Sequence, residues 1–150
     1  MSKVSLKAVV VGAITDIVST NIAMIPILIY FVATRIDFAR LPHDQVQPAI
    51  SAALQSQGPL FVIGLVVGAL CSVLGGYVGA RLATHDEMLN GSLTSFLCVA
   101  IGLYSLSRGN ASGSLPLQLL GFISSPALGL LGGYLRVLQK RTAATTLQPI

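Results

Sequence analysis

The chain has 150 residues, of which 53% are hydrophobic and only 9% are charged, with a formal net charge of +4. A charged fraction this far below the roughly 25% of soluble domains excludes an ordinary soluble protein, because so much apolar surface needs lipid as its solvent. The basic residues are scattered near the ends of apolar segments, which favours membrane anchoring over nucleic-acid binding. Cys71 and Cys98 lie inside apolar segments and form no CxxC pair, so they indicate small buried residues rather than a disulfide framework.

Four segments are apolar over the roughly 20 residues that a membrane-spanning helix needs. They are residues 8–32, 59–83, 89–106 and 115–138. The sequence therefore predicts one all-α domain, residues 1–150, that is a polytopic membrane protein with four transmembrane helices. The first segment is too long for the apolar core of a signal peptide, so we expect it to be retained.

The basic residues that flank these segments divide unequally between the two sides of the membrane. The larger group comprises Lys3, Lys7, Arg81, Arg136, Lys140 and Arg141, and the smaller comprises Arg35, Arg40 and Arg108. Because positive charge accumulates on the cytoplasmic side, both termini are expected in the cytoplasm. The connection 33–58 is then external. In it, Val46, Ile50 and Leu54 recur at helical spacing and predict a short amphipathic helix on the outer membrane surface, with an ordered loop as the alternative.

The second and fourth apolar segments resemble each other. Pro59 aligns with Pro116, and without a gap Leu74-Gly75-Gly76-Tyr77 aligns with Leu131-Gly132-Gly133-Tyr134. A fainter similarity joins Gly12-Ala13-Ile14-Thr15 to Gly91-Ser92-Leu93-Thr94. The pattern predicts two tandem helical hairpins related by an axis along the membrane normal. Chance similarity between glycine-rich segments is the alternative.

Small residues recur every four positions in both of these segments. The helix-packing residues are Gly64, Gly68, Ser72, Gly75, Gly76 and Gly79 in the second segment, and Gly121, Ser125, Gly129, Gly132 and Gly133 in the fourth. Positions four apart share a helix face, and a face of small residues lets two backbones approach closely. The contact predicted is either within the chain or between two copies of it.

Asp16 is the acidic residue that the first segment carries at depth. It lies roughly 13 Å beyond Lys7 at about 1.5 Å per residue, where an ionisable group is costly and indicates function. Ser19, Thr20 and Asn21 complete a candidate intramembrane polar site. One interpretation is a protonatable or cation-binding site; the other is a buried carboxyl hydrogen-bonded to Ser or Thr.

Further polar residues have structural interpretations. Tyr77, Arg81, Tyr134 and Arg136 are expected as anchors at the cytoplasmic boundary. Arg81 could reach Asp16, but snorkelling toward the headgroups is favoured. Thr84 and Glu87 match a capping box, which is favoured over a metal site because consecutive residues cannot converge on one ion. No catalytic fingerprint is present, so we expect no enzyme, no metal and no cofactor.

The run Leu74–Ala83, followed by His85-Asp86-Glu87 and Asn90-Gly91, resembles small uncharacterised bacterial inner-membrane proteins with four helices and an LGGY(V/L)-type motif. The resemblance implies that fold class and a bacterial inner membrane, and it implies no activity. The leading expectation is a non-enzymatic membrane protein acting through helix packing, as an accessory or assembly subunit or a homo-oligomer. The alternative is a small oligomeric transporter or channel that uses Asp16. Expected partners are the lipid bilayer and another membrane protein or a second copy, and no nucleic acid.

Overall fold

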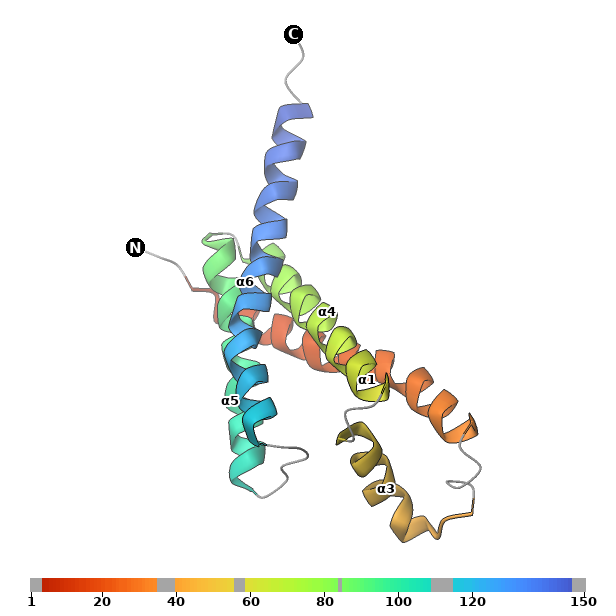
Figure 1. The fold of residues 1–150 in the computed structure, drawn as a ribbon. Helices are drawn as coiled ribbons and strands as arrows, with labels where there is room; N and C mark the ends of the chain where they lie inside the picture. The colour runs from red at the N-terminus through yellow and green to blue at the C-terminus, as the bar shows by residue number, and fades with distance from the viewer. Residues whose placement is uncertain (1–3, 35–39, 56–58, 84, 109–114, 147–150) are drawn as a thin grey trace.

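A computed structural model describes residues 4–34, 40–55, 59–83, 85–108 and 115–146, which form an all-α fold of five helices (Figure 1). The helices are α1 (Leu6–Thr34), α3 (His43–Gln55), α4 (Pro59–Leu82), α5 (Glu87–Ser107) and α6 (Leu115–Thr146). The all-α class is as predicted. α1 packs mainly against α4, α5 packs mainly against α6, and α4 also contacts both α5 and α6.

The helices meet at one end of the molecule and diverge from it (Figure 1). The start of α1, the end of α4 and the start of α5 come together there, and the middle of α6 passes them. We call this meeting point the crossing. From it, α1 and α4 run in one direction and α5 and α6 in another. The last turns of α6 project beyond the crossing, and α3 lies near the opposite end of α4, which it contacts.

Three helices of the described chain, not four, are long and apolar enough to cross a membrane. The candidate spans are Leu6–Tyr30, Val62–Leu82 and Leu119–Ala143. The prediction of four transmembrane helices arranged as two tandem hairpins is therefore wrong. The expected span 89–106 lies in α5, which is helical, but polar residues in its first half lower its hydropathy. Those residues include Asn90, Ser92, Thr94 and Ser95.

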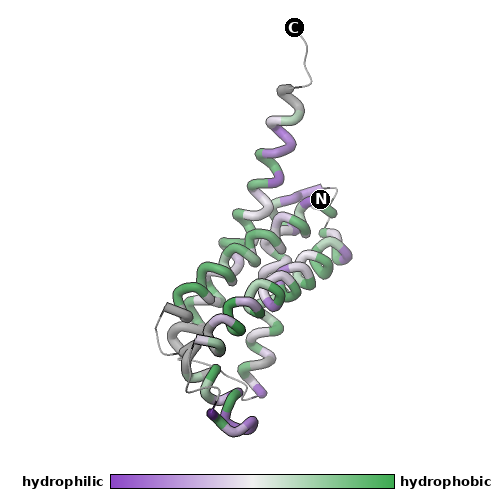
Figure 2. The backbone as a smooth tube through the Cα atoms, turned by 90° about the vertical axis from the view of Figure 1, so that its right-hand side faces the viewer, coloured by the Kyte–Doolittle hydropathy of each residue, from purple (hydrophilic) through white to green (hydrophobic). Residues whose placement is uncertain are grey.

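The outward-facing side chains of the three apolar helices support a membrane location. Ile14 and Ile22 of α1, Leu70 of α4 and Ile123 of α6 are all exposed in the isolated chain. Apolar residues dominate these helices, whereas polar residues gather on α3 and on the last turns of α6 (Figure 2). Such surfaces are costly in water and are solvated by lipid tails. The protein is thus a membrane protein with a small protein-packed core at the crossing.

The helix predicted within the external connection is present as α3. Asp44 lies in its first turn, where a carboxylate interacts favourably with the helix dipole. Val46 and Ile50 are partly covered, whereas Asp44 and Gln47 are exposed, as the amphipathic pattern predicts. Residues 35–39 and 56–58 of the same connection lie outside the described part of the chain.

Candidate functional site

The glycines of the predicted packing rows fall into two groups, and the first lies at the crossing. A Cβ atom on Gly76 of α4 would lie 2.5 Å from the carbonyl oxygen of Gly129 on α6. A Cβ atom on Gly75 would lie 2.7 Å from Cβ of Asp16 on α1. Gly79, Gly132 and Gly133 have similarly close neighbours from other helices. At the crossing, these small residues hold the chain's own helices together.

The second group of small residues is packed much less closely than the first. Gly68 and Gly121 have no atom within 4 Å of the position that a Cβ atom would take. The corresponding position on Gly64 has one neighbour, the methyl carbon of Met24 at 3.9 Å. These glycines lie where α4 and α6 have already diverged. The rows of small residues on α4 and α6 are therefore closely packed at the crossing and border open space further along the two helices.

That open space is a groove of about 670 Å³ between the four longer helices. Ser72 of α4 and Ser125 of α6, both members of the predicted packing rows, line it. The lining residues are Asp16 and Thr20 from α1; Gly64, Leu65, Gly68, Ala69 and Ser72 from α4; Cys98 and Val99 from α5; and Gly121, Phe122, Ser124, Ser125 and Leu128 from α6. The volume lies within the range of about 300–1,000 Å³ that is typical of small-molecule sites.

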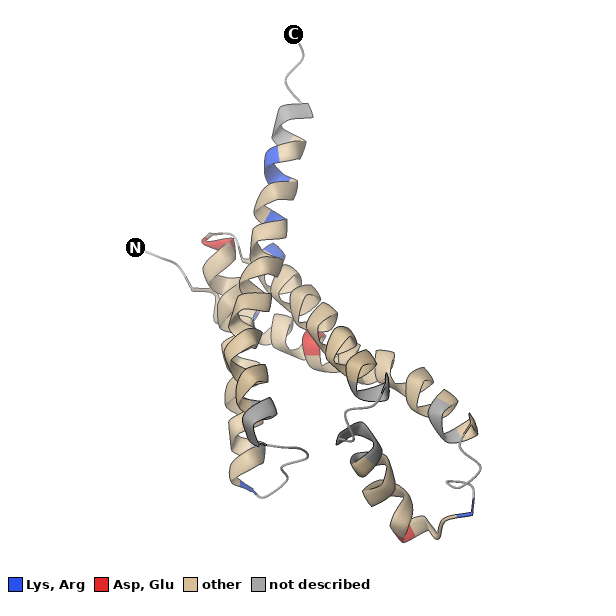
Figure 3. Ribbon diagram, in the orientation of Figure 1, with Lys and Arg blue, Asp and Glu red and all other residues tan. Residues whose placement is uncertain are grey.

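Asp16 lies where the groove meets the crossing. Its residue surface is only 6% exposed, and it is the one acidic residue of α1 (Figure 3). The Ser72 hydroxyl donates to the carboxylate, with Oγ 3.2 Å from Oδ2 and 3.4 Å from Oδ1. The close approach of α1 and α4 at Gly75 brings these two side chains together. The carboxyl group of Asp16 on α1 thus has a hydroxyl group of α4 as a hydrogen-bond partner.

The other members of the predicted polar site divide between the groove and its surroundings. Thr20 lines the groove with Asp16. The Ser19 hydroxyl donates to the Asp16 carbonyl oxygen at 3.1 Å, and the exposed Asn21 amide donates to the Ile17 carbonyl oxygen at 2.7 Å. Ser19 and Asn21 thus satisfy their own helix backbone and are not groove-lining residues.

No basic side chain of the described chain forms an ion pair with Asp16. Arg81, which could have reached it, is exposed at the end of α4 and makes no hydrogen bond to Asp16. The carboxylate therefore has polar neighbours but no fixed positive charge among the residues described.

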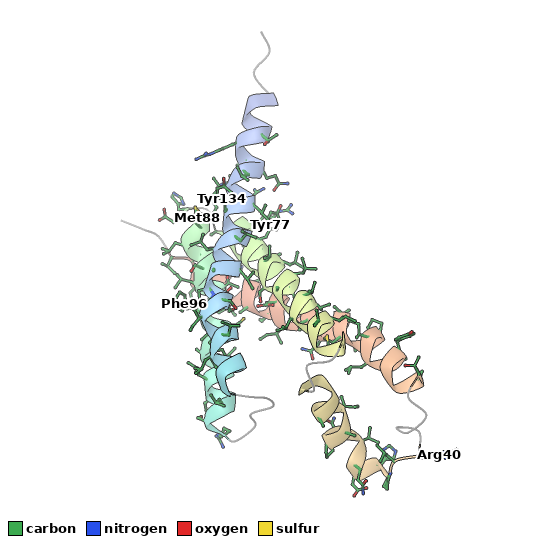
Figure 4. All side chains as sticks on the ribbon, in the orientation of Figure 1. Arg40, Tyr77, Met88, Phe96 and Tyr134 are labelled. Atoms are coloured by element: carbon green, nitrogen blue, oxygen red, sulfur yellow. The ribbon has the colours of Figure 1, made fainter. Side chains whose placement is uncertain are left out.

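The predicted interface anchors cluster at the crossing end of the molecule. The Tyr77 hydroxyl donates to Oε1 of Gln139 at 2.6 Å, and Nη1 of Arg136 donates to the same oxygen at 2.7 Å. Tyr134 is 44% exposed beside them (Figure 4). This network joins the end of α4 to the projecting part of α6, and Arg81 is exposed at the same end of α4.

Glu87 forms an ion pair with Lys140 at this end of the molecule. The hydrogen bond from Lys140 is the main reason that the pKa of Glu87 is lowered from its ordinary value of 4.5, and a bond from its own backbone N–H adds to the effect. Thr84, the other half of the predicted capping box, lies outside the described residues. The side chain of Glu87 therefore links α5 to α6.

Sequence reasoning missed a fully buried polar cluster on α5. Asn90, Thr94 and Ser95 have no exposed surface. The Asn90 amide accepts a hydrogen bond from the Ser5 N–H at 2.9 Å and donates to the carbonyl oxygens of His85 at 2.9 Å and Asp86 at 3.1 Å. The sequence held one indication of this cluster. Gly91 and Ser95 are small residues four positions apart, the same spacing that predicted packed faces on the second and fourth apolar segments.

The chemistry of the groove is set by one carboxyl group, several hydroxyl groups and the thiol of Cys98. In the part of the chain that the structure describes, no three His, Cys, Asp or Glu side chains lie together as a metal site requires. These groups can take up a proton or a positively charged ligand by charge and hydrogen bonding. No protein-family model matches the chain, and neither a curated protein nor a solved structure shows significant similarity to it.

Proposed function

We propose that the protein is a small oligomeric transporter or channel in which Asp16 binds a proton or a cation. The observation that carries the proposal is a carboxyl group that is only 6% exposed, faces a groove, and has no basic partner among the described residues. An unpaired ionisable group at membrane depth costs several kcal/mol, so such groups are kept mainly where they act.

The groups around Asp16 support a binding role over a purely structural one. A structural carboxyl is expected to be enclosed by hydrogen-bond partners on every side. Asp16 accepts hydrogen bonds from Ser72 and has the Cys98 thiol beside it, and it also lines the groove. A hydroxyl lowers the cost of the charge but does not neutralise it. A proton or a cation that enters the groove neutralises the negative charge of Asp16.

The proposed location is the bacterial inner membrane, with both termini in the cytoplasm. Arg81 ends α4 at the crossing, and Arg136, Lys140 and Arg141 follow on the projecting part of α6 (Figure 3). Arg40 lies near α3 at the opposite end of the molecule (Figure 4). Excess positive charge at the crossing end supports a cytoplasmic position for that end.

The test is ion flux through the purified protein in proteoliposomes. A pH-sensitive dye inside the vesicles reports proton entry after a membrane potential is imposed. Asp16→Asn should abolish the protein-dependent flux, and Asn21→Ala, an exposed change on the same helix, should leave it intact. Equal flux in wild type and Asp16→Asn, with both proteins folded, would remove Asp16 from the pathway.

The second candidate is the packing function, an accessory or assembly subunit or a homo-oligomer. It is favoured by the unpacked glycines of the groove, Gly64, Gly68 and Gly121, which present a smooth surface that a further helix can approach. Gly68→Leu should then change the species released into native nanodiscs, as measured by mass spectrometry. An unchanged oligomeric state and an unchanged set of co-extracted proteins would refute this candidate.

A further inference from the structure

We infer that the groove binds a monovalent organic cation, with the charged head at Asp16 and an apolar body between α4 and α6. The inference rests on the proposed function and names the class of ligand that the site takes. It follows from the charge, the walls and the length of the groove.

The charge of the site calls for one positive charge from outside the described chain. Asp16 contributes one carboxylate, and Ser72 is its hydrogen-bond donor. Among the described residues that line the groove, no Lys, Arg or His is present to pair with it. A buried carboxylate and a ligand cation attract strongly where water is scarce, so a single positive charge is the complement of this site.

A single carboxyl group does not balance the two charges of a calcium or magnesium ion, which favours a singly charged ligand. Calcium takes about six to eight oxygen ligands, and magnesium holds to a strict octahedron. The described lining offers one carboxyl group and the hydroxyls of Thr20, Ser72, Ser124 and Ser125, with no second acidic residue. A quaternary ammonium or phosphonium ion needs no ordered shell of oxygen ligands, because carbon groups surround its charge.

The walls of the groove match an apolar body attached to that charge. Leu65, Val99 and Leu128 supply aliphatic surface, and Phe122 supplies an aromatic ring. The Phe122 ring lies against Gly102 of α5. Gly68 and Gly121 have no side chains to narrow the groove between α4 and α6, and no atom lies within 4 Å of the positions their Cβ atoms would take.

The groove is long enough for a drug-sized ligand. Ser72 marks the charged end, and Gly64 lies two turns further along α4, roughly 12 Å away at about 1.5 Å per residue. The volume of about 670 Å³ holds a molecule with several rings. Gly121 and Ser124 are exposed on the α6 side, so the groove is accessible from outside the helix cluster.

The experiment measures binding of radiolabelled tetraphenylphosphonium to the full-length protein in lipid nanodiscs by scintillation proximity. Wild type should show saturable binding. Asp16→Asn should weaken it at least about tenfold, which corresponds to about 1.4 kcal/mol. Gly68→Leu, which fills the groove without touching the carboxylate, should weaken it as well. Asn21→Ala is the matched control and should bind like wild type.

A second measurement uses only the wild-type protein, so its result does not depend on whether a variant folds. Dicyclohexylcarbodiimide modifies carboxyl groups in apolar surroundings, and peptide mass spectrometry identifies the modified residue. Tetraphenylphosphonium should slow modification of Asp16 and leave modification of Asp86 and Glu87 unchanged. No saturable binding to wild type, or equal affinity in all variants together with no protection, would overturn the inference.

The binding and flux measurements test the two proposals independently, so one proposal can be refuted while the other stands. Proton flux that depends on Asp16, without tetraphenylphosphonium binding, would refute the organic-cation site and leave the proposed transport intact. Binding that depends on Asp16, without flux of protons or of the probe, would establish the site and refute transport.

Discussion

Replacing Gly76 with alanine should destabilise the protein, whereas the same change at Gly68 should not. The two glycines lie two turns apart in one row on α4, so the sequence pattern treats them alike. The structure does not. At Gly76 the added carbon would lie 2.5 Å from the Gly129 carbonyl oxygen, 2.8 Å from its Cα and 3.0 Å from its carbonyl carbon; at Gly68 it meets nothing within 4 Å.

The size of the effect follows from what must move. Ordinary contact begins at 3.4 Å, so relief at Gly76 requires α4 and α6 to separate by about 0.9 Å. No rotamer change can help, because every clashing atom is backbone. Overpacking of this kind costs about 1–3 kcal/mol. The gain in helix propensity from Gly to Ala is about 0.5–1 kcal/mol. The two terms together give a net loss of about 1 kcal/mol for Gly76→Ala, against a gain of up to about 1 kcal/mol for Gly68→Ala.

The assay is thermal denaturation in nanodiscs, followed by circular dichroism. A loss of about 1 kcal/mol in a chain of this length lowers the melting temperature by roughly 2–4 °C. Gly68→Ala should melt at or slightly above the wild-type temperature. Equal shifts for the two variants, or a larger loss for Gly68→Ala, would refute the division of the glycine rows into a packed and an open part.

Two further predictions concern the crossing end of the molecule. Asn90→Ala removes a buried amide that makes three hydrogen bonds and should cost about 1–3 kcal/mol, whereas exposed Asn21→Ala should change the melting temperature little. Glu87→Gln should be less stable than wild type above pH 4.5, because the ion pair with Lys140 lowers the pKa of Glu87 in the folded protein. As the pH falls through that lowered pKa, the carboxylate is protonated and the two melting temperatures should converge; a constant difference down to acid pH would exclude the ion pair as the cause.

The sequence sufficed for the helical class and for the helix within residues 33–58, because both depend on local periodicity and hydropathy. The number of spans was predicted wrongly because too little weight was given to the polar residues of α5. Asn90 and Thr94 lower the hydropathy of this helix, which is not among the candidate spans, and both side chains are buried against neighbouring helices. The groove was also beyond reach, since spacing shows which residues share a face but not where α4 and α6 diverge. That point is set by the long-range contact of Gly76 with Gly129.

The hydrogen bond between Ser5 and Asn90 joins positions 85 residues apart and has a consequence for synthesis. At about 5–20 residues per second, a ribosome makes the Ser5 backbone roughly 4–17 s before it makes the side chain that holds it. Through that interval the start of α1 must wait in the membrane or with an insertion factor, joined at most to α4. Packing at the crossing is therefore completed only after α5 and then α6 have been made, because α5 holds the start of α1 and itself packs mainly against α6.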